Sequence, residues 1–280
     1  MRRFITTGAG IFILCLGGSC SNTNQHEAIV PDVTSPTTEK NVDKNVNNKN
    51  TTELIEPVAS SLKGEQPATI AKCSKLMNTS PIIDKLADKT NYGMRHNSDF
   101  KGRSLVDTPQ LIVIHETVMG GPETIALFQT PHPLDKDQGS YHMLIERDGS
   151  RIQVVPDANR AYGAGMSAFG DVTQKIKEKN SISINNIALH ISLVSPKDGL
   201  DNSDAHSGYS DAQYETLAQQ VLLWQATYGI PMARVTTHQA VDRSHSRYDP
   251  RSFRWDHFDS SYQLAARICG LEKYDSRHYE

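Results

Sequence analysis

The sequence predicts an α/β domain in which helices flank a central mixed β-sheet. Two apolar runs, LIVIH at 111–115 and IALHISLV at 187–194, are typical of central strands buried on both faces. The segment 141–155, YHMLIERDGSRIQVV, predicts a β-hairpin with Asp148 and Gly149 at its turn. Helical patterns separate these strands, which favours a single α/β domain.

Sequence signals at the helix ends predict two helices. PETIALFQ at 122–129 follows two glycines and has a proline in its first turn. In the second helix Ser210 and Gln213 predict a capping box, apolar residues follow at helical spacing, and Gly229 ends the helix. A short closing helix is expected at about 258–269.

Residues 231–256 lack apolar periodicity and are expected to form a long loop. A long loop inside a compact domain is usually functional. This one carries two histidines, His238 and His245, together with Asp249.

The first residues predict export. Arg2 and Arg3 precede an apolar run at 4–19 that ends in small residues, which is the layout of a secretory signal at 1–19. The run is shorter than the about 20 residues that a spanning helix needs. LGGSC resembles the lipobox of bacterial lipoproteins, which implies cleavage before Cys20 and a lipid on its thiol. Ser21 after the cysteine implies the outer membrane, facing the periplasm, and a plain signal peptide is the alternative.

The rest of the chain divides by composition. Residues 20–70 are rich in Asn, Thr, Ser, Lys and Glu and are expected to form a disordered tether, because such a segment buries little apolar surface. We expect an ordered arm at 71–105, the domain at 106–270 and a tail at 271–280. A net charge of −3 without a basic stripe gives no support for nucleic acid as a partner.

The interpretation of the cysteines depends on export. With Cys15 in the signal and Cys20 lipidated, Cys73 and Cys269 remain as an even pair in an oxidising compartment. A disulfide between them would join the arm to the end of the last helix. Two unpaired thiols too far apart to bond are the alternative.

Three residues suggest a metal site. His115 ends a buried strand, His238 opens the 231–256 loop and Asp249 closes it. Two neutral imidazoles and one carboxylate form a zinc set that leaves a fourth position for water. Each residue alone is weak evidence, because most single histidines are satisfied core or surface groups.

From Val106 to Cys269 the chain resembles the N-acetylmuramoyl-L-alanine amidase type 2 family. The matching pieces occur in family order: LIVIHET, SYHMLIERDGSRIQVV, RAYGAG, NNIALHISLV, YSDAQYETLA, TTHQAV and RYDPRSFRW. The resemblance implies one Zn²⁺ held by His115, His238 and Asp249. It also implies hydrolysis of the amide bond between the lactyl group of N-acetylmuramic acid and L-alanine in peptidoglycan or muropeptides.

Two positions depart from the family pattern. Ser192 stands where the family often carries a catalytic glutamate, and a neutral serine is no equivalent base. Arg247 replaces a lysine two residues before the last ligand; it can stabilise an oxyanion but stays protonated. His190, on the same strand face as Ser192, is our first candidate for the general base, followed by Glu116 and His245.

Substrate contacts are expected from three residues. His142 recurs in the family beside the cleft, with a structural hydrogen bond as the alternative. Tyr162 and Gly163 stand where a Trp-His pair often occurs, and Ser192 faces the same side as His190. We expect a monomer and an active amidase; a zinc-retaining peptidoglycan-binding module with little turnover is the alternative.

Overall fold

The computed structural model describes residues 62–170 and 172–275. The described residues lie within one compact unit. The expected signal at 1–19, Cys20 and most of the expected tether lie outside the described residues, as does the end of the tail.

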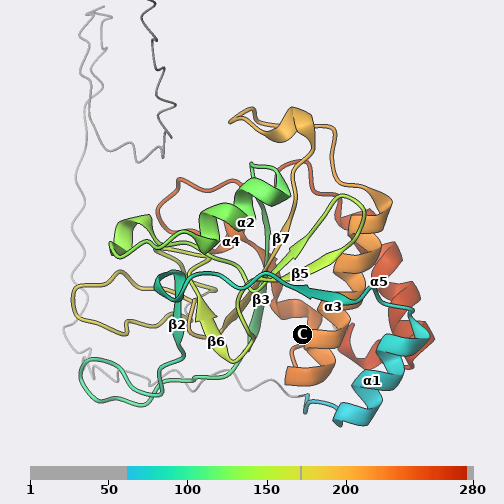
Figure 1. Cartoon of the computed structure of the whole chain (residues 1–280). Coiled ribbons are helices and arrows are strands. Elements are labelled where there is room, and N and C mark those ends of the chain that lie inside the picture. Colours follow the sequence, from blue (N-terminus) through green and yellow to red (C-terminus); the bar gives the residue numbers. More distant parts are fainter. Residues whose placement is uncertain (1–61, 171, 276–280) are drawn as a thin grey trace, which may run out of the picture. The chain divides into compact units, whose positions relative to one another are not determined.

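The domain is built on a six-stranded mixed sheet in the order β1-β5-β4-β7-β3-β8 (Figure 1). Only the β4–β5 pair is antiparallel; the other neighbours run parallel. The strands are β1 (Ile82–Asp84), β3 (Leu111–Glu116), β4 (Met143–Ile145), β5 (Arg151–Gln153), β7 (Ala188–Leu193) and β8 (Val235–Thr237). A separate antiparallel ribbon pairs β2 (Tyr92–Met94) with β6 (Asn159–Ala161). The predicted mixed sheet flanked by helices is confirmed.

Among the α-helices of the described residues, α3 and α5 are the longest. They are α1 (Pro67–Leu76), α2 (Gly121–Gln129), α3 (Asp211–Tyr228), the one-turn α4 (His238–Val241) and α5 (Trp255–Cys269). Short 3₁₀ turns lie at Lys89–Asn91, Asp135–Asp137, Lys197–Gly199, Met232–Arg234 and Glu272–Tyr274. Among the described helices, none combines the length and apolar character that a membrane span requires.

The two faces of the central strands differ in chemistry. Ile114 on β3 and Leu189 and Ile191 on β7 pack with α3 and α5 in the main hydrophobic core. The alternate residues point the other way, as strand geometry requires. On that opposite face the buried strands carry His115, His190 and Ser192, so the sheet brings polar groups together in its interior.

The predicted ends of α3 are confirmed. The Ser210 hydroxyl accepts the backbone N–H of Gln213 at 3.1 Å, and the Gln213 side chain accepts the backbone N–H of Ser210, which closes the capping box. Gly229 ends the helix with φ 70°, a left-handed conformation that glycine adopts without steric cost.

The N-terminal arm supplies a helix and an edge strand to the domain. Helix α1 begins at Pro67, before the expected boundary at residue 71, and packs against α3 and α5. Strand β1 extends the sheet at its edge beside β5. Cys73 and Cys269 form a disulfide that joins α1 to the end of α5, with their Cα atoms 5.0 Å apart.

The prediction of a continuous loop at 231–256 was wrong. The segment contains β8 and α4, and α5 starts at Trp255 instead of about 258. Elements of three and four residues are too short to show a hydrophobic period, so pairing with β3 creates β8 where the sequence gives no signal.

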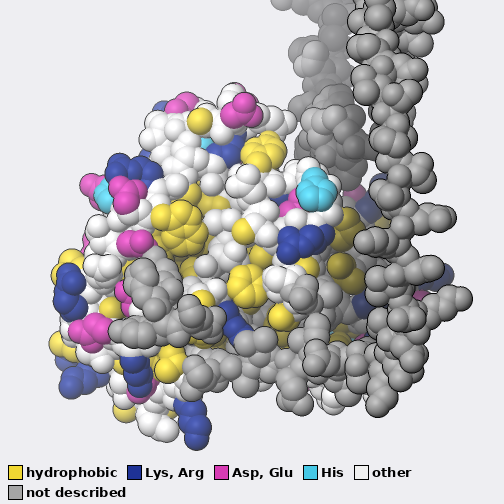
Figure 2. Space-filling view, turned by 180° about the vertical axis from the view of Figure 1, so that it is seen from behind, with side chains coloured by type: hydrophobic (Ala, Val, Ile, Leu, Met, Phe, Trp, Pro, Cys, Tyr) yellow, Lys and Arg dark blue, Asp and Glu magenta, His cyan; other side chains and the backbone are white. Residues whose placement is uncertain are grey.

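Seen from behind, the surface of the domain mixes side chains of different kinds. Figure 2 shows hydrophobic side chains over the middle of this face, with basic and acidic side chains interspersed around them.

Candidate metal centre

Neighbouring strands bring the two histidines together. β3 and β8 are parallel and paired, with Ile114 opposite Thr237. His115 follows Ile114 on β3, and His238 follows Thr237 as the first residue of α4. Since the carboxyl ends of parallel strands meet at one edge of a sheet, the two imidazoles face each other, with ring centroids 4.6 Å apart.

The loop before α5 supplies Asp249. Its carboxylate lies between the two rings: Oδ1 is 2.9 Å from His238 Nδ1, and Oδ2 is 3.3 Å from His115 Nδ1. One ligand atom from each of the three residues lies within 4.8 Å of the others. All three residues are buried. The structure therefore brings together the three residues that the sequence predicts as ligands.

The electrostatics of the cluster suit a divalent cation. Burial, together with the nearby His238, lowers the pKa of His115 to about 4, so its imidazole is neutral. Burial raises the pKa of Asp249, but hydrogen bonding to the His115 and His238 rings outweighs it and holds this pKa below its usual range. His115 Nδ1 is buried; it lies 3.3 Å from Asp249 Oδ2 and makes no other hydrogen bond among the described residues. A neutral imidazole nitrogen beside an ionised carboxylate and a second imidazole fits Zn²⁺.

His142 does not lie where a substrate reaches. Its side chain is 0% exposed, its Nδ1 accepts the backbone N–H of His190 at 2.9 Å, and its Nε2 lies 3.1 Å from the Asn159 carbonyl oxygen. Burial, with the nearby Arg95 charge, lowers the pKa of His142 to about 3. The expected substrate contact is therefore corrected to the structural alternative: a neutral histidine that holds β7.

His190 also differs from its expected role. It lies on the predicted face, but it is 0% exposed and its Nδ1 is 2.9 Å from His115 Nε2. Burial and the neighbouring His115 lower the pKa of His190 well below its usual value. A general base must reach the proton that it takes, and this ring reaches a ligand instead. The structure does not support His190 as the base.

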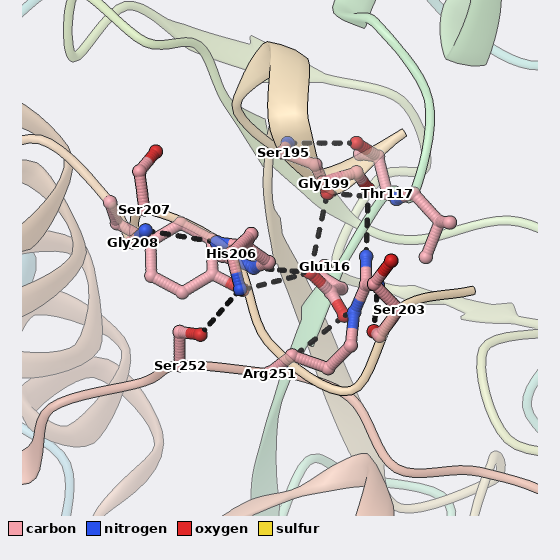
Figure 3. Close-up of polar contacts among 12 residues, drawn as sticks. Glu116, Thr117, Ser195, Gly199, Ser203, His206, Ser207, Gly208, Arg251 and Ser252 are labelled. Atoms are coloured by element: carbon pink, nitrogen blue, oxygen red, sulfur yellow. Dashed lines mark hydrogen bonds and ion pairs between the residues drawn. The ribbon is translucent and has the colours of Figure 1, made fainter. Parts of the chain in front are cut away.

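Glu116 lies on the other face of β3, toward α3, and is not a free carboxylate (Figure 3). Its Oε1 accepts the Arg251 Nε–H at 2.5 Å and the Arg251 backbone N–H at 3.2 Å. Its Oε2 accepts hydrogen bonds from Ser195, His206 and Tyr209. The carboxylate is 0% exposed. Because every approach to it is occupied, the expectation that Glu116 serves as a base is corrected.

Arg251 completes this buried ion pair and was not singled out from the sequence. Its guanidinium also donates to the carbonyl oxygens of Gly199, Asp201 and Ser203. Glu116 directly follows His115, and Arg251 stands two residues after Asp249. The pair therefore joins two of the three segments that carry ligands, β3 and the loop before α5, although 135 residues separate its members.

Asp242 organises the loop that leads to Asp249. Its carboxylate accepts the backbone N–H groups of Ser244, Ser246 and Arg247 at 2.8–3.0 Å. The Arg247 side chain is exposed on this loop, where it lines a shallow pocket with Gln239, Asp242, His245, Ser246 and Tyr248. Arg247 stands two residues before Asp249 in the chain. His245 is exposed on the same loop.

Ser192 is closed to substrate, whereas the substrate contact expected of Tyr162 stays a prediction. Ser192 lies opposite His115 in the β3–β7 register, but it is 0% exposed and its hydroxyl has no partner among the described residues. A fully buried hydroxyl does not meet substrate, so this expectation is corrected. The Tyr162 ring is half-buried and lies over the Arg160 guanidinium at 5.2 Å.

Tyr141 lies beside the cluster and was missed in the sequence. Its ring centroid is 4.6 Å from that of His115. Burial and the Asp249 charge raise the pKa of the Tyr141 hydroxyl, so it stays protonated at neutral pH. The only signal was its place directly before His142, and nothing in the local pattern shows that it turns toward β3.

Comparison with known proteins matches the part of the chain that holds the cluster. The N-acetylmuramoyl-L-alanine amidase family matches residues 106–252, more than half of the chain. The chain belongs to this family. The match contains the three clustered residues, whereas α1, β1 and β2 precede it and α5 follows it.

Relatives of known activity match the same region. The 1,6-anhydro-N-acetylmuramyl-L-alanine amidase AmpD of Salmonella typhimurium is 28% identical over 174 residues, which cover 57% of this chain and 84% of the relative. AmpD of Escherichia coli K12 is 32% identical over 126 residues, covering 40% of this chain and 60% of that protein.

Solved structures of similar proteins include a selenomethionine derivative of AmpD, with 25% identity and a TM-score of 0.46, covering 63% of this chain and 92% of that one. Another is AmpDh3 of Pseudomonas aeruginosa in complex with anhydromuramic pentapeptide, with 17% identity and a TM-score of 0.44 over 62% of each chain.

Proposed function

We propose that this amidase-family protein is a zinc-dependent hydrolase of the amide bond between the lactyl group of N-acetylmuramic acid and L-alanine. The observation that carries the proposal is the convergence of His115, His238 and Asp249, from β3, α4 and the loop before α5, on one buried point. Family membership and the activity of the AmpD relatives supply the substrate class.

Different residues of the chain would have different roles in this reaction. His115, His238 and Asp249 would hold the ion, which when bound supplies Lewis-acid polarisation of the amide carbonyl and activation of a water. Arg247, exposed on the neighbouring loop, carries a permanent positive charge that stabilises the negative charge developing on the carbonyl oxygen. Glu116 and His190 hold the site together and exchange no proton with substrate.

The proposal extends to the location of the enzyme. LGGSC before Ser21 supports an exported lipoprotein, lipidated at Cys20 and held at the outer membrane on the periplasmic side. A substrate in the periplasm would be within reach of an enzyme held at this location. Replacing Cys20 with alanine should abolish labelling of the protein by radioactive palmitate and release it from the membrane fraction; retention of the label would refute the anchor.

A peptidoglycan-binding module without turnover is the second candidate. Serine at 192 and arginine at 247, where the family often carries glutamate and lysine, favour it. The buried ligand cluster opposes it, because a binding surface has no need for an ionised carboxylate held between two imidazoles.

Digestion of muropeptides by the full chain separates these functions. Intact and 1,6-anhydro muropeptides are incubated with the zinc-loaded protein, with and without chelator, and the products are weighed by mass spectrometry. We expect release of an intact stem peptide that chelator abolishes and zinc restores. Asp249→Asn should remove both zinc and turnover, whereas Asp256→Asn, at an exposed site, should change neither. Tight binding of muropeptide without release would identify the binding module.

A further inference from the structure

His190 contacts a candidate ligand with one side of its ring. Its Nδ1 lies 2.9 Å from Nε2 of His115, and both side chains are fully buried. The backbone N–H of His190 is held in turn by Nδ1 of His142 at 2.9 Å, and the two rings are stacked with centroids 5.8 Å apart. Both the backbone and the ring of His190 are thus fixed in place.

The direction of the hydrogen bond follows from the other nitrogen of His115. His115 Nδ1 faces the Asp249 carboxylate, so this nitrogen must be unprotonated to bind a metal. With a metal bound at Nδ1, the ring proton of His115 would sit on Nε2 and would be donated to Nδ1 of His190. His190 carries its own proton on Nε2, which has no partner among the described residues.

Gly163 makes room for this ring. A Cβ atom at position 163 would lie 2.5 Å from both Cγ and Nδ1 of His190, closer than real Cβ atoms come to other atoms. Any residue other than glycine would therefore displace the nitrogen that contacts His115. The need for glycine here is steric, because the crowding comes from the His190 side chain on β7.

We propose that His190 is a positioning residue that accepts the Nε2–H of the ligand His115, and that Gly163 is required for this contact. The proposal rests on the zinc site proposed above and adds to it the residues that orient its first ligand. Histidine ligands of metals nearly always donate their second ring N–H to an acceptor, which fixes the tautomer and the ring plane. Here the acceptor is a second imidazole on the neighbouring strand.

Zinc affinity of the full chain tests the proposal, measured by competition with a chromogenic chelator. His190→Leu fills similar space without an acceptor and should weaken zinc binding about 10- to 100-fold. His190→Asn keeps an acceptor near the position of Nδ1 and should restore most of the affinity. The visible spectrum of the Co²⁺-loaded protein should change in His190→Leu and return toward the parent in His190→Asn.

Gly163 is tested by a double-mutant cycle that separates positioning from simple damage. Gly163→Ala should weaken zinc binding in the parent, but cause no further loss in His190→Ala, where the crowded ring is absent. This second arm decides the question even if His190→Leu folds poorly.

The outcomes are distinguishable. Unchanged zinc affinity in His190→Leu, or equal losses from Gly163→Ala in both backgrounds, would overturn the positioning role while leaving the zinc site intact. A parent chain that binds no zinc would instead overturn the proposed function itself.

Discussion

The buried ion pair between Glu116 and Arg251 allows a sharp prediction for Glu116→Gln. The substitution preserves shape but removes the charge and turns one carboxylate oxygen into an NH₂ donor. Five hydrogen bonds reach this carboxylate, from Arg251, Ser195, His206 and Tyr209. An amide would leave the Arg251 guanidinium without its counter-charge. Its NH₂ group would also face the N–H and O–H donors that now bind the carboxylate.

The expected cost follows from the burial of the pair. Glu116 and Arg251 expose 0% and 1% of their side chains, so water screens neither charge. Breaking a buried pair by removing one partner costs about 3–5 kcal/mol. With a urea m-value of roughly 2–3 kcal/mol/M for a domain of this size, the unfolding midpoint should fall by roughly 1–2.5 M.

Equilibrium urea unfolding in the presence of chelator is the assay, because bound zinc would add its own stabilisation. Asp256→Asn is the matched control: it breaks the Arg254–Asp256 pair, whose side chains are 63% and 69% exposed, and should unfold with the parent. If Glu116→Gln unfolded within about 0.5 kcal/mol of the parent, the pair would not hold the two ligand-bearing segments, and our reasoning would fail.

Three further predictions concern other contacts. Replacing Cys73 and Cys269 with serine opens a loop of 196 residues; loop entropy sets an upper limit of about 5 kcal/mol on the loss. Reductant should therefore lower the melting temperature of the parent but not of the double variant. Burial raises the pKa of Asp242, but hydrogen bonds from Ser244 and backbone N–H groups outweigh it and hold this pKa at about 2, against 3.8 for a free side chain. Because the folded pKa is the lower one, its contribution of up to about 2 kcal/mol is present above pH 4 and lost as pH falls toward 2. Asp242→Asn should flatten the unfolding free energy across that window, and an unchanged slope would contradict this assignment. Arg247→Ala should lower kcat about 10²- to 10³-fold with unchanged zinc affinity, as expected for loss of an oxyanion-stabilising group; an unchanged kcat would exclude that role.

Local patterns in the sequence were enough for the central strands and for α3. The buried runs at 111–115 and 187–194, and the capping box at Ser210, depend on neighbours in the chain and were predicted with nearly correct ends. β1 and β8 have three residues each and exist because β5 and β3 offer them an edge. No local pattern carries that information.

The same difference between local patterns and long-range contacts applies to the site. The ligands were found because their residue types and order resemble those of a family. The partners of the candidate bases depend on contacts across 75 residues for His190 and 135 for Glu116. Strand alternation correctly placed His190 and Ser192 on the side of His115. It could not show that this side is closed to solvent at both residues.

The close approach of Gly163 to His190 limits the order in which the two positions could have changed during evolution. Histidine at 190 is incompatible with a Cβ at 163, which would lie 2.5 Å from the ring. Glycine at 163 makes no such demand on residue 190. A chain with a side chain at 163 could therefore reach the present pair by losing that side chain first. Substitution of Gly163 alone is opposed sterically while His190 remains.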